Sequence, residues 1–266
     1  MPSWIIYLAF AIAFILVSTV VFFFTLTRGA LVLREAFGVR HDAAHVYPIY
    51  TRMWLIKLVD WQPVIAAILL FQYDKLVSVI TRGLHDTNLH NKKVLITSCA
   101  FGNVIPRVVS AAIQSGASGV LIADIVRNEL THAEGKLIEF SGKLEFLDEN
   151  ATAMKLADGS VDANVIFFLL HELPHHLKGE ALREAGRVLA PGGKLYLAEF
   201  HRPDPLLLRA LSWIYFKVFE PLGLALWSSH DPLAQLEAMG GFSCERRTIF
   251  FGNFQVIVAT KKVLLH

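Results

Sequence analysis

The run HELPHH at residues 171–176 contains the spacing H-E-x-x-H, with which two histidines bind zinc in metalloproteases. That chemistry requires both imidazoles on one face of a helix. The apolar run FFLL directly before His171 favours a strand, and Pro174 lies inside the spacing, where a helix tolerates proline only in its first turn. The sequence therefore argues against a zinc protease, and it leaves His171 and Glu172 as a polar pair at the end of a strand.

Further polar and loop-forming residues follow other apolar runs. The candidate ligand-binding residues among them are Ser98, Cys99, Ala100, Phe101, Gly102, Asp124, Ile125, Asn150, Ala151 and His201. Asp124 lies about twenty residues beyond Gly102, which is typical of a carboxylate that accepts the two hydroxyls of an adenosine ribose. The alternative for Asp124 is a turn residue that caps the next helix.

Alternating strands and helices between about residues 92 and 262 must position these side chains. The predicted strands are KKVLITSCA, SGVLIADI, KLEFLDENA, VDANVIFFLL and KLYLAEF; the helices between them are NVIPRVVSAAIQSG, RNELTHAEGKL and GEALREAGRVL, the last closed by the turn APGG. Two final strands joined at Gly252-Asn253 predict a hairpin that adds antiparallel edge strands. The expected fold is α/β: a doubly wound, mostly parallel sheet that binds ligands at the carboxyl ends of its strands.

This order of elements, with DGSVDANVIFFLLHEL and REAGRVLAPGGKLYLAEF, resembles the class I S-adenosylmethionine (SAM)-dependent methyltransferase superfamily over roughly residues 92–262. The resemblance implies a Rossmann-like fold, with SAM bound at the loop 98–102, at Asp124 and Ile125, and at Asn150 and Ala151. Typical members have an acidic residue and three glycines where this chain has Ile96, Ser98 and Ala100, and only Gly102 remains. Asn150 stands where an aspartate usually meets the adenine amine, and its side-chain oxygen can accept that bond.

These departures, together with FFLLHELP (167–174), FHRP (200–203) and FEPLGLALW (219–227), resemble a narrower group, the rhodoquinone-biosynthesis enzymes. The group exchanges a methoxy group of ubiquinone for an amino group, and the resemblance implies SAM as amino donor and a manganese ion. A carboxylate near the SAM ammonium favours its charged form, so Ile96 in that place should lower the amine pKa and leave more neutral nucleophile. The alternative is that Ile96 only continues a buried strand.

His171, Glu172 and His201 are the candidate catalytic and metal-binding residues in this fold, beside Ile96. Imidazole and carboxylate groups suit a divalent metal such as manganese, which would act as a Lewis acid on the quinone carbonyl. Alternatively, His171 is a general base that deprotonates the attacking amine. The third possibility is that a His–Glu pair fixes the loop by hydrogen bonds.

A membrane anchor is predicted at residues 1–27, which include no charged side chain. As a helix, the run 4–26 would be about 35 Å long, enough to cross a hydrocarbon core of about 30 Å. A cleaved signal peptide would have Lys or Arg before its apolar run, and this run has none. Instead, Arg28, Arg34 and Arg40 follow it. The positive-inside rule therefore places the rest of the chain in the cytoplasm.

Two further segments, 63–71 and 205–227, are apolar but too short or too charged to span, and they predict amphipathic helices. Both could cover the site or contact lipid. The expected organisation is an anchor at 1–27, a helical juxtamembrane or lid region at 28–90, and a methyltransferase-like domain at 91–266.

Composition limits the remaining possibilities. With 54% hydrophobic and 18% charged residues the chain is not disordered, and two cysteines exclude a disulfide scaffold. A net charge of +2 gives no electrostatic basis for binding nucleic acid. We therefore expect SAM-dependent amination of a ubiquinone-type lipid, with the membrane and other quinone-synthesis proteins as candidate partners. The alternatives are SAM-dependent methylation of a quinone or other lipophilic acceptor, and a non-catalytic scaffold with this fold.

Overall fold

The structure, a computed structural model, describes residues 3–22, 50 and 52–263. Its strands are β1 (Lys93–Thr97), β2 (Gly119–Asp124), β3 (Leu144–Asp148), β4 (Val161–Phe167), β5 (Leu189–Phe200), β6 (Phe242–Ile249) and β7 (Phe254–Lys261). Its α-helices are α1 (Ser3–Phe22), α4 (Met53–Val59), α5 (Gln62–Ile68), α6 (Tyr73–His85), α7 (Val104–Gln114), α8 (Arg127–Lys136), α9 (His175–Val188), α10 (Leu206–Phe219) and α11 (Pro232–Ala238). Two 3₁₀ segments, η2 (Ile138–Lys143) and η3 (Pro221–Trp227), complete the described elements.

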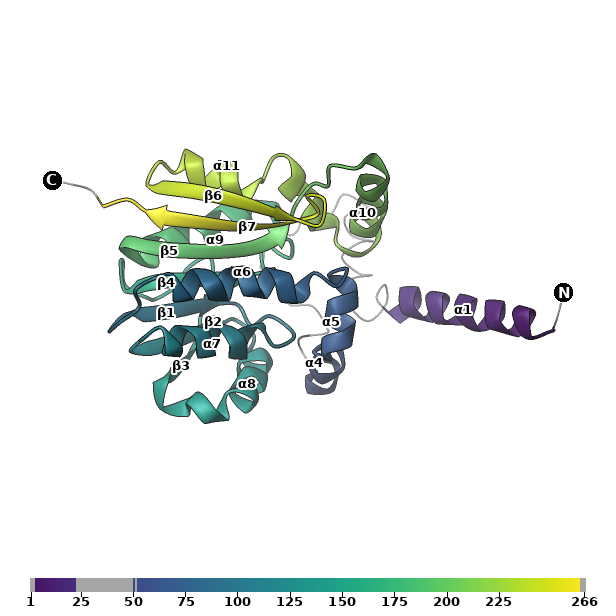
Figure 1. The fold of residues 1–266 in the computed structure, drawn as a ribbon, viewed down its shortest axis with the longest axis horizontal. Coiled ribbons are helices and arrows are strands. Elements are labelled where there is room, and N and C mark those ends of the chain that lie inside the picture. The colour runs from purple at the N-terminus through teal and green to yellow at the C-terminus, as the bar shows by residue number, and fades with distance from the viewer. Residues whose placement is uncertain (1–2, 23–49, 51, 264–266) are drawn as a thin grey trace.

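The strands form one sheet in the order β3-β2-β1-β4-β5-β7-β6 (Figure 1). Strands β1 to β5 pair in parallel, and β7 is antiparallel to both of its neighbours. The strand order reverses between β1 and β4, which is the switch point where doubly wound sheets bind their ligands. The predicted Rossmann-like, mostly parallel sheet with an antiparallel C-terminal hairpin is confirmed.

The hairpin differs from the prediction in one respect, because β7 is not an edge strand. It inserts between β5 and β6, so that β6 is the edge strand on this side of the sheet. Burial explains this order. The run FQVIVATK is buried over most of its length, whereas FSCERRTI alternates between buried and exposed side chains.

Helices cover both faces of the sheet. On one face α6 packs against α7 and α8 contacts β2 and β3, and on the other α9 contacts β5 while α11 contacts β6 and α9. The sequence did not predict α11. Helix α6 falls in the predicted juxtamembrane region, yet it packs against α7, β5 and β7. It does so because four apolar side chains on one helical face are fully buried: Leu76, Val77, Ile80 and Leu84.

The predicted turn APGG is wrong, since these residues belong to β5. The pairing of β4 with β5 shifts register between Val161 and Ala163, and Gly192 has a φ of +79°. The glycines therefore form a bulge inside a strand that begins directly after α9. Helix α9 begins at His175, earlier than predicted, with Pro174 as its extended N-cap residue.

Beyond the carboxyl ends of the parallel strands lie α4, α5 and α10, and α1 projects from this same end (Figure 1). The segment Trp4–Val21 of α1 is long and apolar enough to cross a membrane, and none of it is buried. Residues 23–27 of the predicted anchor and the three arginines that follow lie outside the described residues.

Candidate active site

A cavity of about 390 Å³ opens at the switch point, between the carboxyl ends of the strands and helices α4, α5 and α10. This volume is in the range that holds a small organic ligand. Its described lining residues include no Lys or Arg, but they include His171 and five acids: Asp124, Glu129, Glu149, Glu172 and Glu220. Such a lining favours a positively charged ligand and disfavours a phosphate-bearing one.

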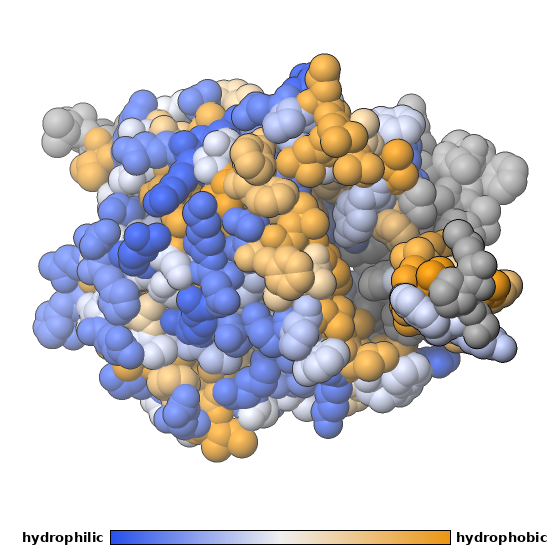
Figure 2. Space-filling view, turned by 45° about the vertical axis from the view of Figure 1, so that its right-hand side comes forward, coloured by the Kyte–Doolittle hydropathy of each residue, from blue (hydrophilic) through white to orange (hydrophobic). Residues whose placement is uncertain are grey.

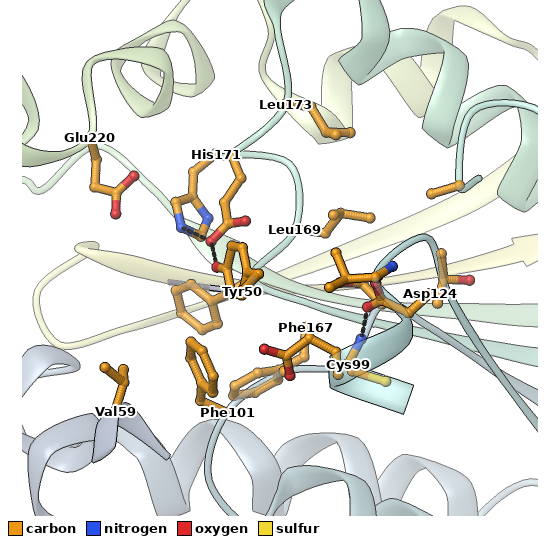
Figure 3. A pocket seen from close by; sticks show the side chains of 18 of the residues that line it. Tyr50, Val59, Cys99, Phe101, Asp124, Phe167, Leu169, His171, Leu173 and Glu220 are labelled. Carbon is orange, nitrogen blue, oxygen red and sulfur yellow. Dashed lines mark hydrogen bonds and ion pairs between the residues drawn. The ribbon is translucent and has the colours of Figure 1, made fainter. Parts of the chain in front are cut away.

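Asp124 lies at the end of β2, buried, with its carboxylate against the loop that follows β1 (Figure 3). Its Oδ2 accepts the Cys99 N–H at 2.6 Å, and its Oδ1 accepts the Val126 N–H at 2.7 Å. The Ser98 side chain also hydrogen-bonds to this carboxylate, so one of its about four acceptor positions remains for a hydroxyl group. Burial raises the pKa of Asp124 to about 6, which leaves it mainly ionised at neutral pH. This geometry fits the ribose-binding role that the sequence predicts.

The loop after β1 contributes Ser98, Cys99, Ala100 and Phe101 to the cavity wall. Ser98 has a φ of +76°, a conformation that favours glycine, and its N–H donates to Ala123 O at 2.8 Å. The loop therefore keeps the backbone of a glycine-rich turn after losing the glycine. Burial raises the pKa of the Cys99 thiol well above its usual value, so this cysteine is a neutral packing residue.

Gly102 does not line the cavity, contrary to the prediction. Its φ is +83°, and a Cβ there would lie 2.5 Å from Tyr73 Oη. The Gly102 N–H donates to Asp60 Oδ1 at 2.6 Å, and its carbonyl accepts from Lys136 Nζ at 2.8 Å. Lys136 Nζ is also 3.0 Å from both Asp60 oxygens, and His132 Nε2 is 2.8 Å from Oδ2. Gly102 thus supports the loop from behind, within an ionic network from α4 and α8.

Ile125, Asn150 and Ala151 all line the cavity beside Asp124, as predicted for residues near an adenine. Asn150 Oδ1, however, accepts both the backbone N–H and the hydroxyl of Thr152, at 3.0 and 2.9 Å. These two bonds occupy the lone pairs of the amide oxygen. An adenine amine would therefore bond to Asn150 only if this local turn opened.

His171 and Glu172 follow β4 and line the cavity. His171 lies across the cavity from Asp124 (Figure 3). His171 Nδ1 lies 3.1 Å from Glu199 Oε1, and Glu199 also accepts the backbone N–H of His171 and of Phe200. Burial would lower the pKa of His171, but the carboxylates of Glu199 and its neighbours outweigh burial and raise it. Glu172 Oε1 lies 3.9 Å from His171 Nε2 and accepts the hydroxyl of Tyr50.

Aromatic and aliphatic side chains form the rest of the wall. They come from α4 and α5, from the ends of β4 and β5, and from α10: Val59, Ile65, Ile68, Leu69, Phe167, Phe168, Phe200, Tyr215 and Phe219. Phe168 and Phe200 meet edge to face at 4.9 Å between centroids. The cavity thus joins a carboxylate-rich part to a part suited to an apolar ring.

Two predicted catalytic residues lie away from this cavity. Ile96 is 4% exposed and packs in the core between its strand neighbours Ile122 and Val165, so its side chain does not reach the ligand space. His201 lines a separate cavity with Arg246. The reason is that its N–H pairs with Asn253 O and its Nδ1 lies 2.7 Å from Gly252 O, which holds it against the β6–β7 hairpin.

The predicted metal set of His171, Glu172 and His201 is therefore not brought together. Among the described residues, no group of three His, Cys, Asp or Glu side chains is arranged to hold a metal ion. Arg246 Nη1 lies 3.3 Å from His201 Nε2, and its positive charge opposes a cation there. These residues do not fit the manganese ion that the resemblance implies. His175 also begins α9 after Pro174, so His171 and His175 share no helix and form no zinc-protease motif.

Sequence reasoning did not identify five acids that the structure places at or behind the site: Asp60, Glu129, Glu149, Glu199 and Glu220. Glu129, Glu199 and Glu220 are buried, with 4%, 0% and 7% exposure. For Glu199 a signal was available, because it is the one charged residue in the apolar run LYLAEF. A charge within a buried strand needs a partner, and His171 is that partner.

Comparison with known sequences places this geometry in a family. The sequence model of the ubiE/COQ5 methyltransferase family matches residues 63–234. The chain is 29% identical over 172 residues to the ubiquinone/menaquinone biosynthesis C-methyltransferase UbiE of Bartonella quintana (strain Toulouse), covering 60% of this chain and 65% of that protein. It is 35% identical over 112 residues to the UbiE of Hahella chejuensis, covering 41% and 44%. The chain thus spans less than two thirds of the length of either relative.

Solved structures share the fold at low sequence identity. An O-methyltransferase family protein from Burkholderia thailandensis superposes with a TM-score of 0.60 at 14% identity, covering 88% of this chain and 69% of that one. A SAM-dependent methyltransferase from Aquifex aeolicus gives 0.53 at 19% identity, covering 80% and 99%. These structures support the class I methyltransferase fold, and the family match covers more than half of the sequence. The chain therefore belongs to the ubiE/COQ5 methyltransferase family.

Proposed function

We propose that this chain is a membrane-anchored, SAM-dependent C-methyltransferase that acts on a reduced quinone-type lipid. The observation that supports this most is the cavity at the switch point, which joins a part rich in carboxylates to a part lined by aromatic side chains. The first part suits a cationic adenosyl compound, and the second suits an apolar ring. The relatives named above are C-methyltransferases of ubiquinone and menaquinone biosynthesis, which supports the same conclusion.

In the carboxylate-rich part, Asp124 would hold the ribose hydroxyls and the loop 98–101 would lie along the adenosyl group. When bound, SAM supplies a methyl group on a positively charged sulfur. The five lining acids favour that charge, and the aromatic walls exclude water from the transfer.

In the aromatic part, His171 would accept a proton from a ring hydroxyl of the acceptor. Glu199 binds Nδ1 and the backbone N–H of His171, which orients the imidazole and leaves Nε2 as the proton acceptor. The ionised ring then has a nucleophilic carbon. This carbon gains the methyl group as the carbon–sulfur bond breaks, its own proton goes to solvent, and S-adenosylhomocysteine is released.

The surface around the cavity supports access from a membrane. Large apolar side chains are exposed on α4, on α10 and beside α5: Trp54, Leu58, Trp61, Phe71, Leu206, Leu207, Leu211, Trp213 and Ile214. Figure 2 shows a band of hydrophobic residues on the face that includes this end of the molecule, with mostly hydrophilic residues at the opposite end. Thr19 of α1 also lines the cavity. A lipid-borne ring could therefore enter from the bilayer in which α1 is anchored.

Amino transfer to ubiquinone, giving rhodoquinone, is the second candidate. It is favoured by the replacement of the usual strand-one acid with Ile96 and by the glycine-poor loop that follows. The comparisons support methyl transfer better than amino transfer, because the relatives that they identify transfer methyl groups to carbon.

Isotopic labelling separates these reactions. The full chain in detergent would be incubated with a reduced quinone extract and with SAM labelled either with ¹³C in the methyl group or with ¹⁵N in the amino group. Our proposal predicts a quinone product that contains the ¹³C label and not the ¹⁵N label. A product that contains the ¹⁵N label and has lost one methoxy group would refute methyl transfer and show amino transfer. Failure to bind SAM at all would favour the non-catalytic scaffold.

A further inference from the structure

The proposed mechanism gives no individual role to the buried cavity acid Glu129. Glu129 lies in the first turn of α8, is 4% exposed, and lines the same cavity as Asp124. Its Oε1 is fully buried and has no hydrogen-bond partner among the described residues. A buried polar atom without a hydrogen bond is unfavourable, so an unpaired oxygen at a binding cavity points to a ligand that satisfies it.

The charged groups around Glu129 explain why its Oε1 has no partner in the part of the chain that the structure describes. Asp124 on β2, Asp60 after α4 and Glu172 after β4 are all acids, and Lys136 is the cation on its own helix. Lys136 Nζ is already bonded to both oxygens of Asp60 and to Gly102 O. Burial and the charge of Asp124 raise the pKa of Glu129 to about 9, so the free protein holds it protonated at neutral pH. A ligand that brings both a positive charge and a hydrogen-bond donor would ionise it.

SAM has one group that meets both requirements. Its sulfonium is charged but has no N–H, and its ribose hydroxyls and adenine amine are donors without charge. Its α-ammonium is charged and has three N–H donors. Strand β1, where superfamily members typically have an acid for this ammonium, has Ile96 facing the core. Resting on the proposed function, we infer that Glu129 is a further binding residue of the site and holds the α-ammonium of the methionine portion of SAM.

This assignment has a measurable consequence. Binding converts the neutral carboxyl of Glu129 into a carboxylate paired with the ammonium, and the displaced proton passes to the buffer. At pH about 7.5 a group with a pKa of about 9 is almost fully protonated before binding, so about one proton should be released per SAM bound. Asp124 adds little at this pH, because it is mainly ionised already.

Calorimetric titration of the full chain in detergent, in two buffers with different heats of ionisation, measures this proton release. We expect about one proton for SAM and also for S-adenosylhomocysteine, which keeps the ammonium and lacks the sulfonium charge. Methylthioadenosine keeps the adenine and ribose but has no ammonium, and it should release almost none. Equal release with all three compounds would overturn the assignment without any substitution.

The variant Glu129→Gln keeps the shape of the side chain and removes its charge. It should weaken SAM binding by about 10- to 100-fold, abolish the proton release, and leave methylthioadenosine affinity unchanged. Glu134→Gln, on the exposed surface of the same helix, is the control and should retain both affinity and release. If Glu129→Gln binds SAM with unchanged affinity and unchanged proton release, the role of Glu129 is refuted but the proposed function is not. Absence of binding by the unmodified chain for all three compounds would refute the proposed function and this inference together.

Discussion

Asp60 supports the loop 98–102 through a partly buried carboxylate, and its removal should destabilise the protein more than removal of an exposed acid in a surface ion pair. Its carboxylate accepts the Gly102 N–H and pairs with Lys136 and His132. A hydrogen bond to a charged acceptor contributes about 1.5–3 kcal/mol, and the partly exposed pair with Lys136 adds about 1 kcal/mol or less. We therefore expect Asp60→Ala to lower the free energy of unfolding by about 2–4 kcal/mol.

The matched control is Asp74→Ala. Asp74 also pairs with a basic residue of a neighbouring helix, Arg107, at 2.6 Å. Its side chain is 81% exposed, however, against 12% for Asp60. Solvent screens such a pair, so the control should lose no more than about 1 kcal/mol.

Urea unfolding and hydrogen exchange test this prediction in the same samples. Asp60→Ala should lose protection of the Gly102 amide and bind SAM about tenfold more weakly, because the loop 98–102 is no longer held from behind. Asp60→Asn, which keeps an acceptor oxygen but loses the charge, should fall between Asp60→Ala and the unmodified chain. Equal stability losses for the Asp60→Ala and Asp74→Ala variants, with Gly102 still protected, would refute the reasoning.

Three further predictions concern the same cavity. Methylthioadenosine, which has the ribose but no ammonium to ionise Glu129, should bind more weakly as pH drops below about 6, because protonation removes acceptor positions from Asp124. Asp124→Asn should abolish this dependence, and calorimetry at several pH values would refute the ribose role if the two profiles coincide. Gly102→Ala should lower the free energy of unfolding by about 2–4 kcal/mol, because of the positive φ of Gly102 and the contact of a Cβ with the Tyr73 hydroxyl. Gly135→Ala, whose Cβ would meet no atom within 4 Å, should not destabilise the protein, and equal melting temperatures of the two variants would contradict this prediction. Glu199→Gln should lower the pKa of His171, because burial then dominates; an NMR titration that shows no decrease would contradict this.

Local patterns were sufficient to predict the strands β1 to β5 and the helices α7, α8 and α9 that connect them, but not α11. Apolar runs such as VDANVIFF and the amphipathic helices between them depend on nearby residues alone. The insertion of β7 beside β5 was not predictable in this way, because it depends on which strand of the hairpin is buried on both faces. The PGG bulge was mistaken for a turn because the same residues favour both structures.

The strand-end rule identified most of the cavity wall but not the direction of each side chain. Asp124, Asn150 and His171 line the cavity as expected, since each lies at or just beyond the carboxyl end of a parallel strand, β2, β3 and β4 respectively. His201 does not, because its backbone pairs with the hairpin loop, a contact between distant parts of the chain. Buried acids such as Glu129 were missed for a similar reason: an acid in the first turn of a helix is usually exposed, and only tertiary packing buries it.

A structure of the full chain determined with S-adenosylhomocysteine would test the central claim most directly. We predict ribose hydroxyls within hydrogen-bond distance of the Asp124 carboxylate, the adenine beside Ile125 and Ala151, and the sulfur directed toward the aromatic wall near His171. A complex in which the adenosyl group binds elsewhere, or in which side chains fill this cavity while the compound stays in solution, would contradict the account.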